Sequence, residues 1–477
     1  MTSNNSTTQV HLLVCVHGMW GEPGHVSRLA EVVKETHPEP EDGVELDVLV
    51  AETNRDENTY DGVDWGAERV IEEIKARIAY IEGASPSSSS AKRRKVTRFS
   101  IFGYSLGGLV SRYTVGILYA TKFFDTVKPI NFATIATPHI GLTRYRGSFL
   151  SGLTHTLGPR LLSRTGKQFY AKDNDDWGDG KGKPLVEVMS EKDSVFFEGL
   201  SQFKHILFVG NAIDDLTVPF VTACAEPYDP FSGHAESGIE IELDERYAPI
   251  IKSFKYPAAP PPRPPKQGFI ARVRAWWSAP SALPPFLQIR FPLNILFYLL
   301  LPILIPTVVT LIIGNFTWNS LKSKKRIRLL EAKETDNRSA IVKFVSNLEH
   351  RVEDAVVEMM EDEGSPNQLA DPEKNYTTTG VPPLSTRRSK TRRQSVTYSP
   401  ITPNPNPVRS AAQPALTPLQ LRIIENLNQL PRLHKAFVWL DGLRNTHATI
   451  VCRDLHQFEF HRRGEGVLRY LADGFEM

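Results

Sequence analysis

The pentapeptide Gly103-Tyr104-Ser105-Leu106-Gly107 constrains the fold of this chain more than any other segment. It fits the G-x-S-x-G pattern, in which a serine stands on a strained turn between a strand and a helix. An apolar stretch, 99–102, precedes it, and an amphipathic stretch, 106–120, follows it. The pattern alone is weak, because a glycine-rich turn whose serine caps a helix also satisfies it. Its position between a predicted strand and a predicted helix favours a serine with a chemical role.

The segments around this motif alternate between strand-like and helix-like patterns. Short apolar runs, typical of buried strands, alternate with stretches whose apolar residues recur at helical spacing. Such alternation predicts an α/β fold with a mostly parallel sheet and helices on both faces. The predicted strands are 10–16, 44–50, 99–102, 131–136 and 206–209, and the predicted helices are 24–36, 63–82 and 106–120.

The composition of the chain argues against some functions and compartments. With 477 residues, the chain has room for one large catalytic domain and additional segments. Its 56 Lys and Arg nearly balance its 54 Asp and Glu, so we expect no nucleic-acid partner. Cys15, Cys224 and Cys452 form neither a paired framework nor a metal-ligand spacing, which suits a reducing compartment. The first nine residues have no basic patch followed by an apolar run, so we expect no secretory signal and a domain facing the cytosol.

Changes in composition divide the chain into four regions. The predicted regions are a catalytic core over 1–254, a proline-rich linker with an apolar segment over 255–330, a charged helix with a disordered insertion over 331–416, and a return to the core over 417–477.

The returning region and the insertion carry further signals. We expect strands at 435–440 and 448–451 and a closing helix at 464–473. The insertion holds a basic cluster, 387–393, which fits a nuclear import signal, a kinase-regulated patch or solvated disorder. Residues 152–162 are a candidate lid or acyl-contact surface.

A serine hydroxyl is a weak nucleophile unless a base removes its proton and a carboxylate orients that base. In folds with this elbow the chain order is serine, acid, histidine, which excludes His139 although it follows a predicted strand. Asp215 lies just after the strand 206–209 and is the preferred acid, with Asp214 as its competitor. Asp214 also fits a loop aspartate that bonds its own backbone.

Six histidines follow the candidate acid. His447 stands in a turn before a strand-like run and is the preferred base, with His456 and His461 as alternatives. His234 lies in a polar loop and His350 in a charged helical pattern, so we expect both at the surface. His434 lies at the edge of a predicted strand.

The candidate oxyanion donors are the backbone N–H groups of Leu106 and Met19. This fold takes one donor from the residue after the nucleophile and one from a separate strand-to-helix loop. Met19 lies in such a loop, because it follows the first predicted strand. Chemistry of this type requires no metal and no cofactor.

Five motifs together resemble the fungal putative serine esterase family, and most closely its lipid-droplet phospholipases. They are HLLVCVHGMWG, FGYSLGGLVSRY, FATIATPHIGL, GNAIDDLTVPF and NTHATIVCRD, within 10–225 and 417–477. The resemblance implies an α/β-hydrolase lipase that acts on glycerophospholipids or related esters, and it carries the catalytic roles onto Ser105, Asp215 and His447. One departure is Tyr104, because many such lipases have histidine there.

A stretch of 23 residues without a charge, 291–313, is long enough to cross a bilayer as a helix. A single crossing would separate His447 from the other two candidate residues, so both ends are expected on the cytosolic side. Pro302 and Pro306 favour a re-entrant hairpin or a bent interfacial helix. Such a device could enter a membrane or the phospholipid monolayer of a lipid droplet. The alternative is a core helix or lid of a soluble enzyme.

Residues suited to the membrane interface flank this stretch. Basic residues on both sides favour two cytosolic ends, and tryptophans could lie at the headgroup level. They are Arg272, Arg274, Arg290, Lys322, Lys324, Lys325, Arg326 and Arg328, with Trp276, Trp277 and Trp318.

The sequence therefore predicts a serine lipase or phospholipase with a lipid substrate at a membrane or lipid-droplet surface. Two alternatives remain open. The same machinery serves a neutral-lipid esterase or a thioesterase, and an inactive member of the fold would serve as a membrane-bound interaction protein.

Overall fold

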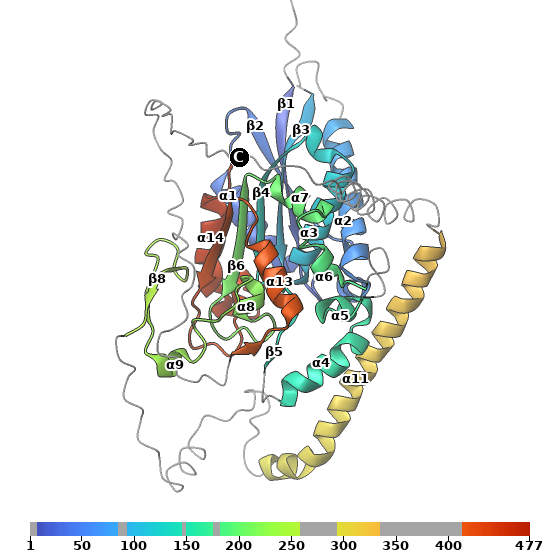
Figure 1. Ribbon diagram of the computed structural model, residues 1–477, viewed down its shortest axis with the longest axis vertical. Helices are drawn as coiled ribbons and strands as arrows, with labels where there is room; N and C mark the ends of the chain where they lie inside the picture. The colour runs from blue at the N-terminus through green and yellow to red at the C-terminus, as the bar shows by residue number, and fades with distance from the viewer. Residues whose placement is uncertain (1–6, 84–92, 146–148, 175–181, 258–292, 334–412) are drawn as a thin grey trace, which may run out of the picture.

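A computed structural model describes residues 7–83, 93–145, 149–174, 182–257, 293–333 and 413–477 (Figure 1). Its centre is a six-stranded sheet in the order β10-β6-β4-β3-β1-β2, and every neighbouring pair is parallel. The strands are β1 (Thr8–Val16), β2 (Val44–Val50), β3 (Arg94–Tyr104), β4 (Lys128–Ile135), β6 (His205–Asn211) and β10 (Leu433–Val438). The predicted α/β-hydrolase type of fold, with a mostly parallel sheet, is confirmed.

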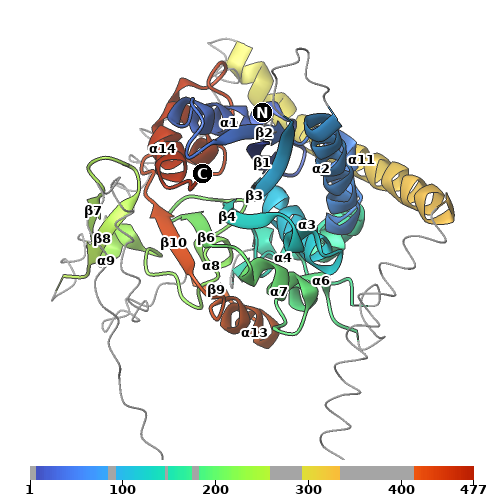
Figure 2. The ribbon, with the colours of Figure 1, turned by 90° about the horizontal axis from the view of Figure 1, so that it is seen from above.

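Helices cover both faces of the sheet (Figure 2). One face carries α1 (Gly24–Thr36) and α14 (Glu465–Asp473), and the other carries α2 (Val63–Gly83), α3 (Leu106–Ala120) and α7 (Val195–Ser201). Within β1, Leu12 and Val14 join the core under α2 and α3, whereas Leu13 and Cys15 join the core under α1 and α14. Successive side chains of a strand point to opposite faces, so an uninterrupted apolar run suits a strand that is buried on both sides.

Shorter elements surround this body. The helices are α4 (Phe149–Leu161), α5 (Ser163–Phe169), α6 (Leu185–Val188), α8 (Phe220–Ala223), α9 (His234–Ser237) and α13 (Pro418–Leu427). Two small antiparallel pairs join β5 (Arg144–Tyr145) to β9 (Pro414–Ala415) and β7 (Glu240–Leu243) to β8 (Ile251–Lys255). The 3₁₀ turns are η1 (Asp56–Tyr60), η2 (Phe123–Asp125), η4 (Thr449–Val451) and η5 (Glu459–Gly464).

The C-terminal residues return to the sheet, because β10 pairs with β6. The strand expected at 448–451 is wrong: these residues form η4. The preceding Thr446 is fixed by two contacts, its N–H to the Asp214 carbonyl (3.0 Å) and its hydroxyl to the Ile213 carbonyl (3.0 Å). Ile450 N–H then bonds back to the Thr446 carbonyl (3.1 Å). The apolar residues are thus buried by a tight turn and have no neighbouring strand.

The apolar stretch forms part of one helix, α11 (Leu293–Lys333), which runs through both Pro302 and Pro306. The hairpin option is therefore wrong for these residues, and Figure 1 shows the helix bending near its N-terminal, yellow end. Proline in a helix removes one hydrogen bond and kinks the axis without necessarily ending the helix.

α11 is long and apolar enough to cross a membrane over Leu299–Ala332, and its most apolar window has no residue buried in the protein. Its N-terminal half projects beyond α4, whereas its C-terminal half lies against the catalytic body (Figure 1). A fully buried core helix would hide its apolar side chains, so this exposure argues against that alternative.

Several sequence expectations lie outside the described residues. They concern residues 334–412 of the predicted charged helix and disordered insertion, which include His350 and the basic cluster 387–393. They also concern the flanking Arg272, Arg274, Arg290, Trp276 and Trp277.

Candidate active site

Ser105 occupies a strained turn between β3 and α3. Its backbone dihedrals are φ 55° and ψ −124°, a region that residues other than glycine rarely adopt. The two glycines of the motif, Gly103 and Gly107, are required because there is no room for a Cβ atom at either position. A Cβ on Gly103 would lie 2.5 Å from the Gly107 carbonyl oxygen, and one on Gly107 would lie 2.2 Å from the Val16 carbonyl oxygen. The G-x-S-x-G pattern here therefore reflects close packing of backbone against backbone.

Ser105, His447 and Asp215 meet at the carboxyl edge of the sheet. Ser105 Oγ lies 3.0 Å from His447 Nε2, and His447 Nδ1 lies 2.9 Å from Asp215 Oδ2. All three are buried, with 6%, 7% and 7% of their surface exposed. Segments that are 232 and 342 residues apart in sequence thus supply one hydrogen-bonded chain.

The Asp215 carboxylate is held by more than the histidine. Its Oδ1 accepts hydrogen bonds from the backbone N–H groups of Thr217 (3.0 Å) and Val218 (2.8 Å). Its Oδ2 also accepts a hydrogen bond from Asn211 Nδ2 (2.9 Å). A carboxylate that only accepts hydrogen bonds requires the proton of His447 on Nδ1, which leaves Nε2 as an acceptor for the serine proton. The side chain of its competitor, Asp214, is exposed.

Tyr104 holds His447 in place, a role that sequence reasoning did not find. Its hydroxyl donates to the His447 carbonyl oxygen (2.9 Å), and the two rings lie 5.2 Å apart. Burial raises the pKa of Tyr104, so the phenol stays a neutral donor. The sequence did mark Tyr104, because the lipases that this chain resembles often have histidine at that position. It could not show the contact, because His447 lies 343 residues away in sequence.

The other candidate histidines occupy different surroundings. His139 is fully buried, stacks on Phe208 and bonds Thr134 through Nε2 (2.8 Å), and burial lowers its pKa well below the usual value. His456 is exposed, and the His461 ring bonds the backbone of Asp454. His234 packs on Trp439. Within the described part of the chain, His447 is the imidazole that bonds Ser105.

The loop after β1 lies against the nucleophile. A Cβ on Gly18 would approach Ser105 Cβ to 2.7 Å and Ser105 Oγ to 3.2 Å, so Gly18, the neighbour of Met19, packs against the nucleophile. Leu106 begins α3, whose N-terminus points backbone N–H groups and positive dipole at Ser105. The next loop residue, Trp20, donates from Nε1 to the Tyr60 hydroxyl (2.9 Å) and stacks on Phe316 of α11.

The described residues contain no group of three or more His, Cys, Asp or Glu side chains that could hold a metal ion. Cys15, Cys224 and Cys452 are buried as free thiols, and burial raises the pKa of each.

The N-terminal part of the chain is similar to known proteins. Residues 6–227 match the model described as "Putative serine esterase (DUF676)". The "Putative lipase C4A8.10" of Schizosaccharomyces pombe is 28% identical over 220 residues, which are 45% of this chain and 26% of that protein. The "Putative lipase ROG1" of Saccharomyces cerevisiae is 31% identical over 164 residues, 34% of this chain and 22% of that protein. The matches thus span about a quarter of the length of these relatives.

Solved structures show weaker similarity. A phospholipase, PlaB of Legionella pneumophila, aligns with a TM-score of 0.24 and 13% identity, covering 44% of this chain and 39% of that chain. The "putative cell surface hydrolase" of Lactobacillus plantarum aligns with a TM-score of 0.24 and 14% identity, covering 46% of this chain and 75% of that chain.

Proposed function

We propose that this chain is a serine hydrolase that cleaves acyl ester bonds of glycerophospholipids. The match of residues 6–227 to the model of a putative serine esterase family supports this proposal. The proposal depends chiefly on one observation, the hydrogen-bonded chain from Ser105 through His447 to Asp215. Such a chain supplies a nucleophile, a general base and an orienting acid.

The proposed reaction proceeds in two halves. His447 Nε2 takes the proton of Ser105 Oγ while the oxygen attacks the ester carbonyl carbon, and the carbonyl oxygen becomes an oxyanion. The backbone N–H groups of Met19 and Leu106 are the proposed donors to that oxyanion. The C–O bond then breaks, the alcohol leaves with the proton from His447, and an acyl-serine remains. Water, deprotonated by His447, attacks the acyl-serine, releases the fatty acid and restores Ser105.

The surroundings of the site support a lipid substrate. Two exposed apolar side chains directly follow site residues: Trp20 follows Met19 and is 51% exposed, and Leu216 follows Asp215 and is 76% exposed. Large exposed apolar side chains beside a buried site suit contact with an acyl chain or a lipid surface. The relatives in Schizosaccharomyces pombe and Saccharomyces cerevisiae carry the names "Putative lipase C4A8.10" and "Putative lipase ROG1".

We further propose that α11 attaches the enzyme to a membrane or lipid-droplet surface while the catalytic body stays in the cytosol. Ser105 and Asp215 precede α11 and His447 follows it, so all three must remain on one side. The C-terminal half of α11 packs on the same body, which supports a partial insertion of the N-terminal half instead of a crossing.

A fluorophosphonate probe tests the serine chemistry. We expect the full chain to label, and Ser105→Ala and His447→Ala to abolish labelling without loss of folding. Absence of labelling in the natural chain would favour the inactive interaction protein. A panel of phospholipid, acylglycerol and thioester substrates then distinguishes the phospholipase from the neutral-lipid esterase and the thioesterase.

Imaging tests the attachment. Lysines at two exposed α11 positions, Ile303→Lys and Ile312→Lys, should release the protein from its organelle, because a charge in hydrocarbon is costly. Deletion of 291–314 should do the same. Unchanged attachment in both variants would exclude α11 as the anchor.

A further inference from the structure

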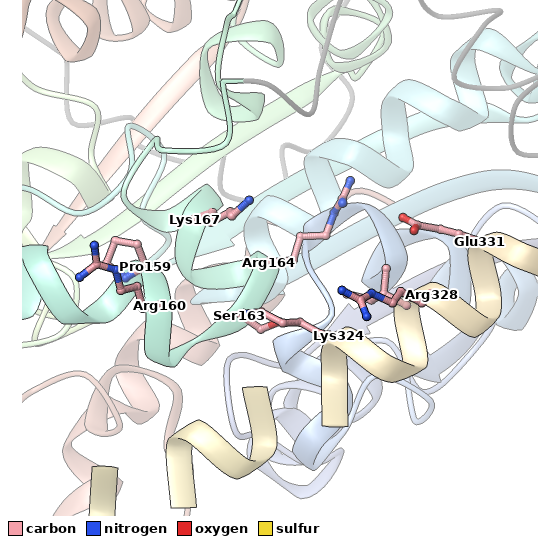
Figure 3. A pocket seen from close by; sticks show the side chains of 9 residues that line it. Pro159, Arg160, Ser163, Arg164, Lys167, Lys324, Arg328 and Glu331 are labelled. Atoms are coloured by element: carbon pink, nitrogen blue, oxygen red, sulfur yellow. The ribbon is translucent and has the colours of Figure 1, made fainter. Parts of the chain in front are cut away.

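A basic groove lies where α11 meets the catalytic body (Figure 3). Its walls are the end of α4 and α5 on one side and the C-terminal half of α11 on the other, and its volume is about 290 Å³. Five of its lining residues are basic and one is acidic, namely Arg160, Arg164, Lys167, Lys324, Arg328 and Glu331. We call this feature the basic groove.

The positive charge of the basic groove is accessible. Lys324 and Arg328 lie one turn apart on α11 and are exposed, and Arg160 at the end of α4 is exposed as well. Arg164 differs, because its Nε bonds the buried Asp64 (3.0 Å). The groove therefore presents a concentration of cationic side chains toward solvent, which favours an anionic ligand.

The walls of the basic groove are joined by buried polar contacts. Asp61 has no exposed surface and accepts hydrogen bonds from Arg326 (2.7 and 2.8 Å) and from Ser323 (2.7 Å), both on α11. Ser323 is also 3.1 Å from Ser163 of α5, and Ser320 donates to the Arg160 carbonyl (3.2 Å). These contacts hold α11 at a fixed position on α4 and α5, so the groove exists before any ligand arrives.

The same helix indicates what kind of ligand the groove meets. The apolar stretch before the groove is exposed, with Ile303 at 68% and Leu311 at 68%. Trp318 is 62% exposed and precedes Lys324 by six residues, about 9 Å along a helix. Apolar side chains, then a tryptophan, then basic residues is the order in which a helix passes from hydrocarbon through the interface to the phosphate layer.

We propose that the basic groove binds the phosphate headgroup of an anionic phospholipid, next to the point where α11 enters the lipid surface. This inference rests on the proposed attachment to a lipid surface and does not depend on the serine chemistry. Headgroup binding in the groove would add affinity for anionic lipid to the apolar insertion of α11. Because Phe316 of α11 stacks on Trp20 beside the site, the bound headgroup would also orient the mouth of the site toward the surface.

Flotation of the full chain with vesicles tests this proposal, in a Ser105→Ala background so that no lipid is hydrolysed. One vesicle type is phosphatidylcholine alone, and in the other about one lipid in four is phosphatidylserine. The test variant is K324Q/R328Q. The matched control is K322Q/K325Q, which removes the same charge from the same helix at positions outside the groove.

We expect K324Q/R328Q to weaken binding to the anionic vesicles about 100-fold, because two charge-assisted hydrogen bonds to the phosphate are lost, each contributing about tenfold in affinity. The control should lose less than about threefold, and all variants should bind phosphatidylcholine alike through the apolar stretch. An equal loss in both variants would show general attraction to the surface and would overturn the proposal, as would no loss in either.

Two further measurements separate the remaining outcomes. Thermal stabilisation of the natural chain by inorganic phosphate without vesicles, lost in K324Q/R328Q, would assign the groove to a free anion and overturn the lipid assignment. Fluorophosphonate labelling of the same variants with Ser105 restored shows that they fold. If the natural chain binds anionic vesicles but does not label, the serine chemistry fails while the groove proposal stands.

Discussion

Replacement of Asp215 by asparagine should nearly abolish the proposed activity while leaving the fold intact. In the structure Asp215 Oδ1 accepts two backbone N–H groups and Oδ2 accepts His447 Nδ1–H and Asn211 Nδ2. An asparagine would keep its oxygen toward the backbone N–H groups and turn its NH₂ toward His447. His447 Nδ1 must then accept, so Nε2 carries the proton and can no longer take the one from Ser105.

The magnitude follows from this change of tautomer. Loss of the orienting acid in a Ser-His-Asp triad lowers kcat about 10⁴-fold, which corresponds to about 5.4 kcal/mol of transition-state stabilisation. Substrate binding does not use the buried carboxylate, so KM should stay within about threefold. Hydrolysis of a soluble p-nitrophenyl ester measures kcat and KM separately, and urea unfolding checks that stability is retained.

Asp214→Asn is the matched control. Asp214 is the neighbouring residue, its side chain is exposed, and its carbonyl accepts the Thr446 N–H irrespective of the side chain. We expect less than a threefold change in kcat for this variant. A loss of about tenfold or less in Asp215→Asn, or an equal loss in Asp214→Asn, would refute the tautomer argument and the choice of Asp215.

Three further predictions concern stability. Gly107→Ala should destabilise the protein by about 3 kcal/mol in urea unfolding, because the new Cβ would meet the Val16 backbone. Gly314→Ala should not destabilise it, because a Cβ there has no atom within 4 Å. Equal effects of the two substitutions would contradict the packing argument. Asp61→Ala should lower the free energy of unfolding by about 3 kcal/mol, because Arg326 loses its buried partner. The same substitution should speed amide hydrogen exchange in the C-terminal half of α11. Unchanged exchange would show that other contacts hold the helix. Burial lowers the pKa of His11 from 6.5 to about 3, so the unfolded chain binds a proton at a higher pH than the folded chain does. The free energy of unfolding should therefore fall as the pH drops below about 6.5, by about 1.4 kcal/mol per pH unit. His11→Gln should reduce this pH dependence of the urea midpoint, and an unchanged pH dependence would assign it to other groups.

Much of the fold and of the candidate site could be predicted from the sequence. The apolar runs and helical periodicities place the strands of the sheet, because a parallel strand covered on both faces must be apolar throughout. The elbow is recognisable locally, since Ser105 and its glycines lie within five residues. Chain order then excludes His139. The position just after a predicted strand favours Asp215 or Asp214 as the acid, and a turn before a strand-like run favours His447 among the six later histidines.

Two expectations failed for physical reasons that local patterns do not contain. Residues 448–451 resemble a strand, but the partners of Thr446 in another loop fix a turn there. The prolines of α11 suggested a hairpin or a bent helix, and the hairpin is wrong, because a helix can continue through proline with a bend when the flanking residues favour the helix.

Steric fit and burial act between neighbouring residues, so the sequence alone determined the strands of the central sheet, the helices near 24–36, 63–82 and 106–120, and the elbow. The tertiary structure decided which side chains meet. Tyr104 reaches the His447 carbonyl, and Arg160 and Lys324 line one groove, only because distant segments pack around one sheet. Such contacts form because whole helices and strands bury their apolar surfaces against one another. The pattern within one segment does not show which other segments it will pack against.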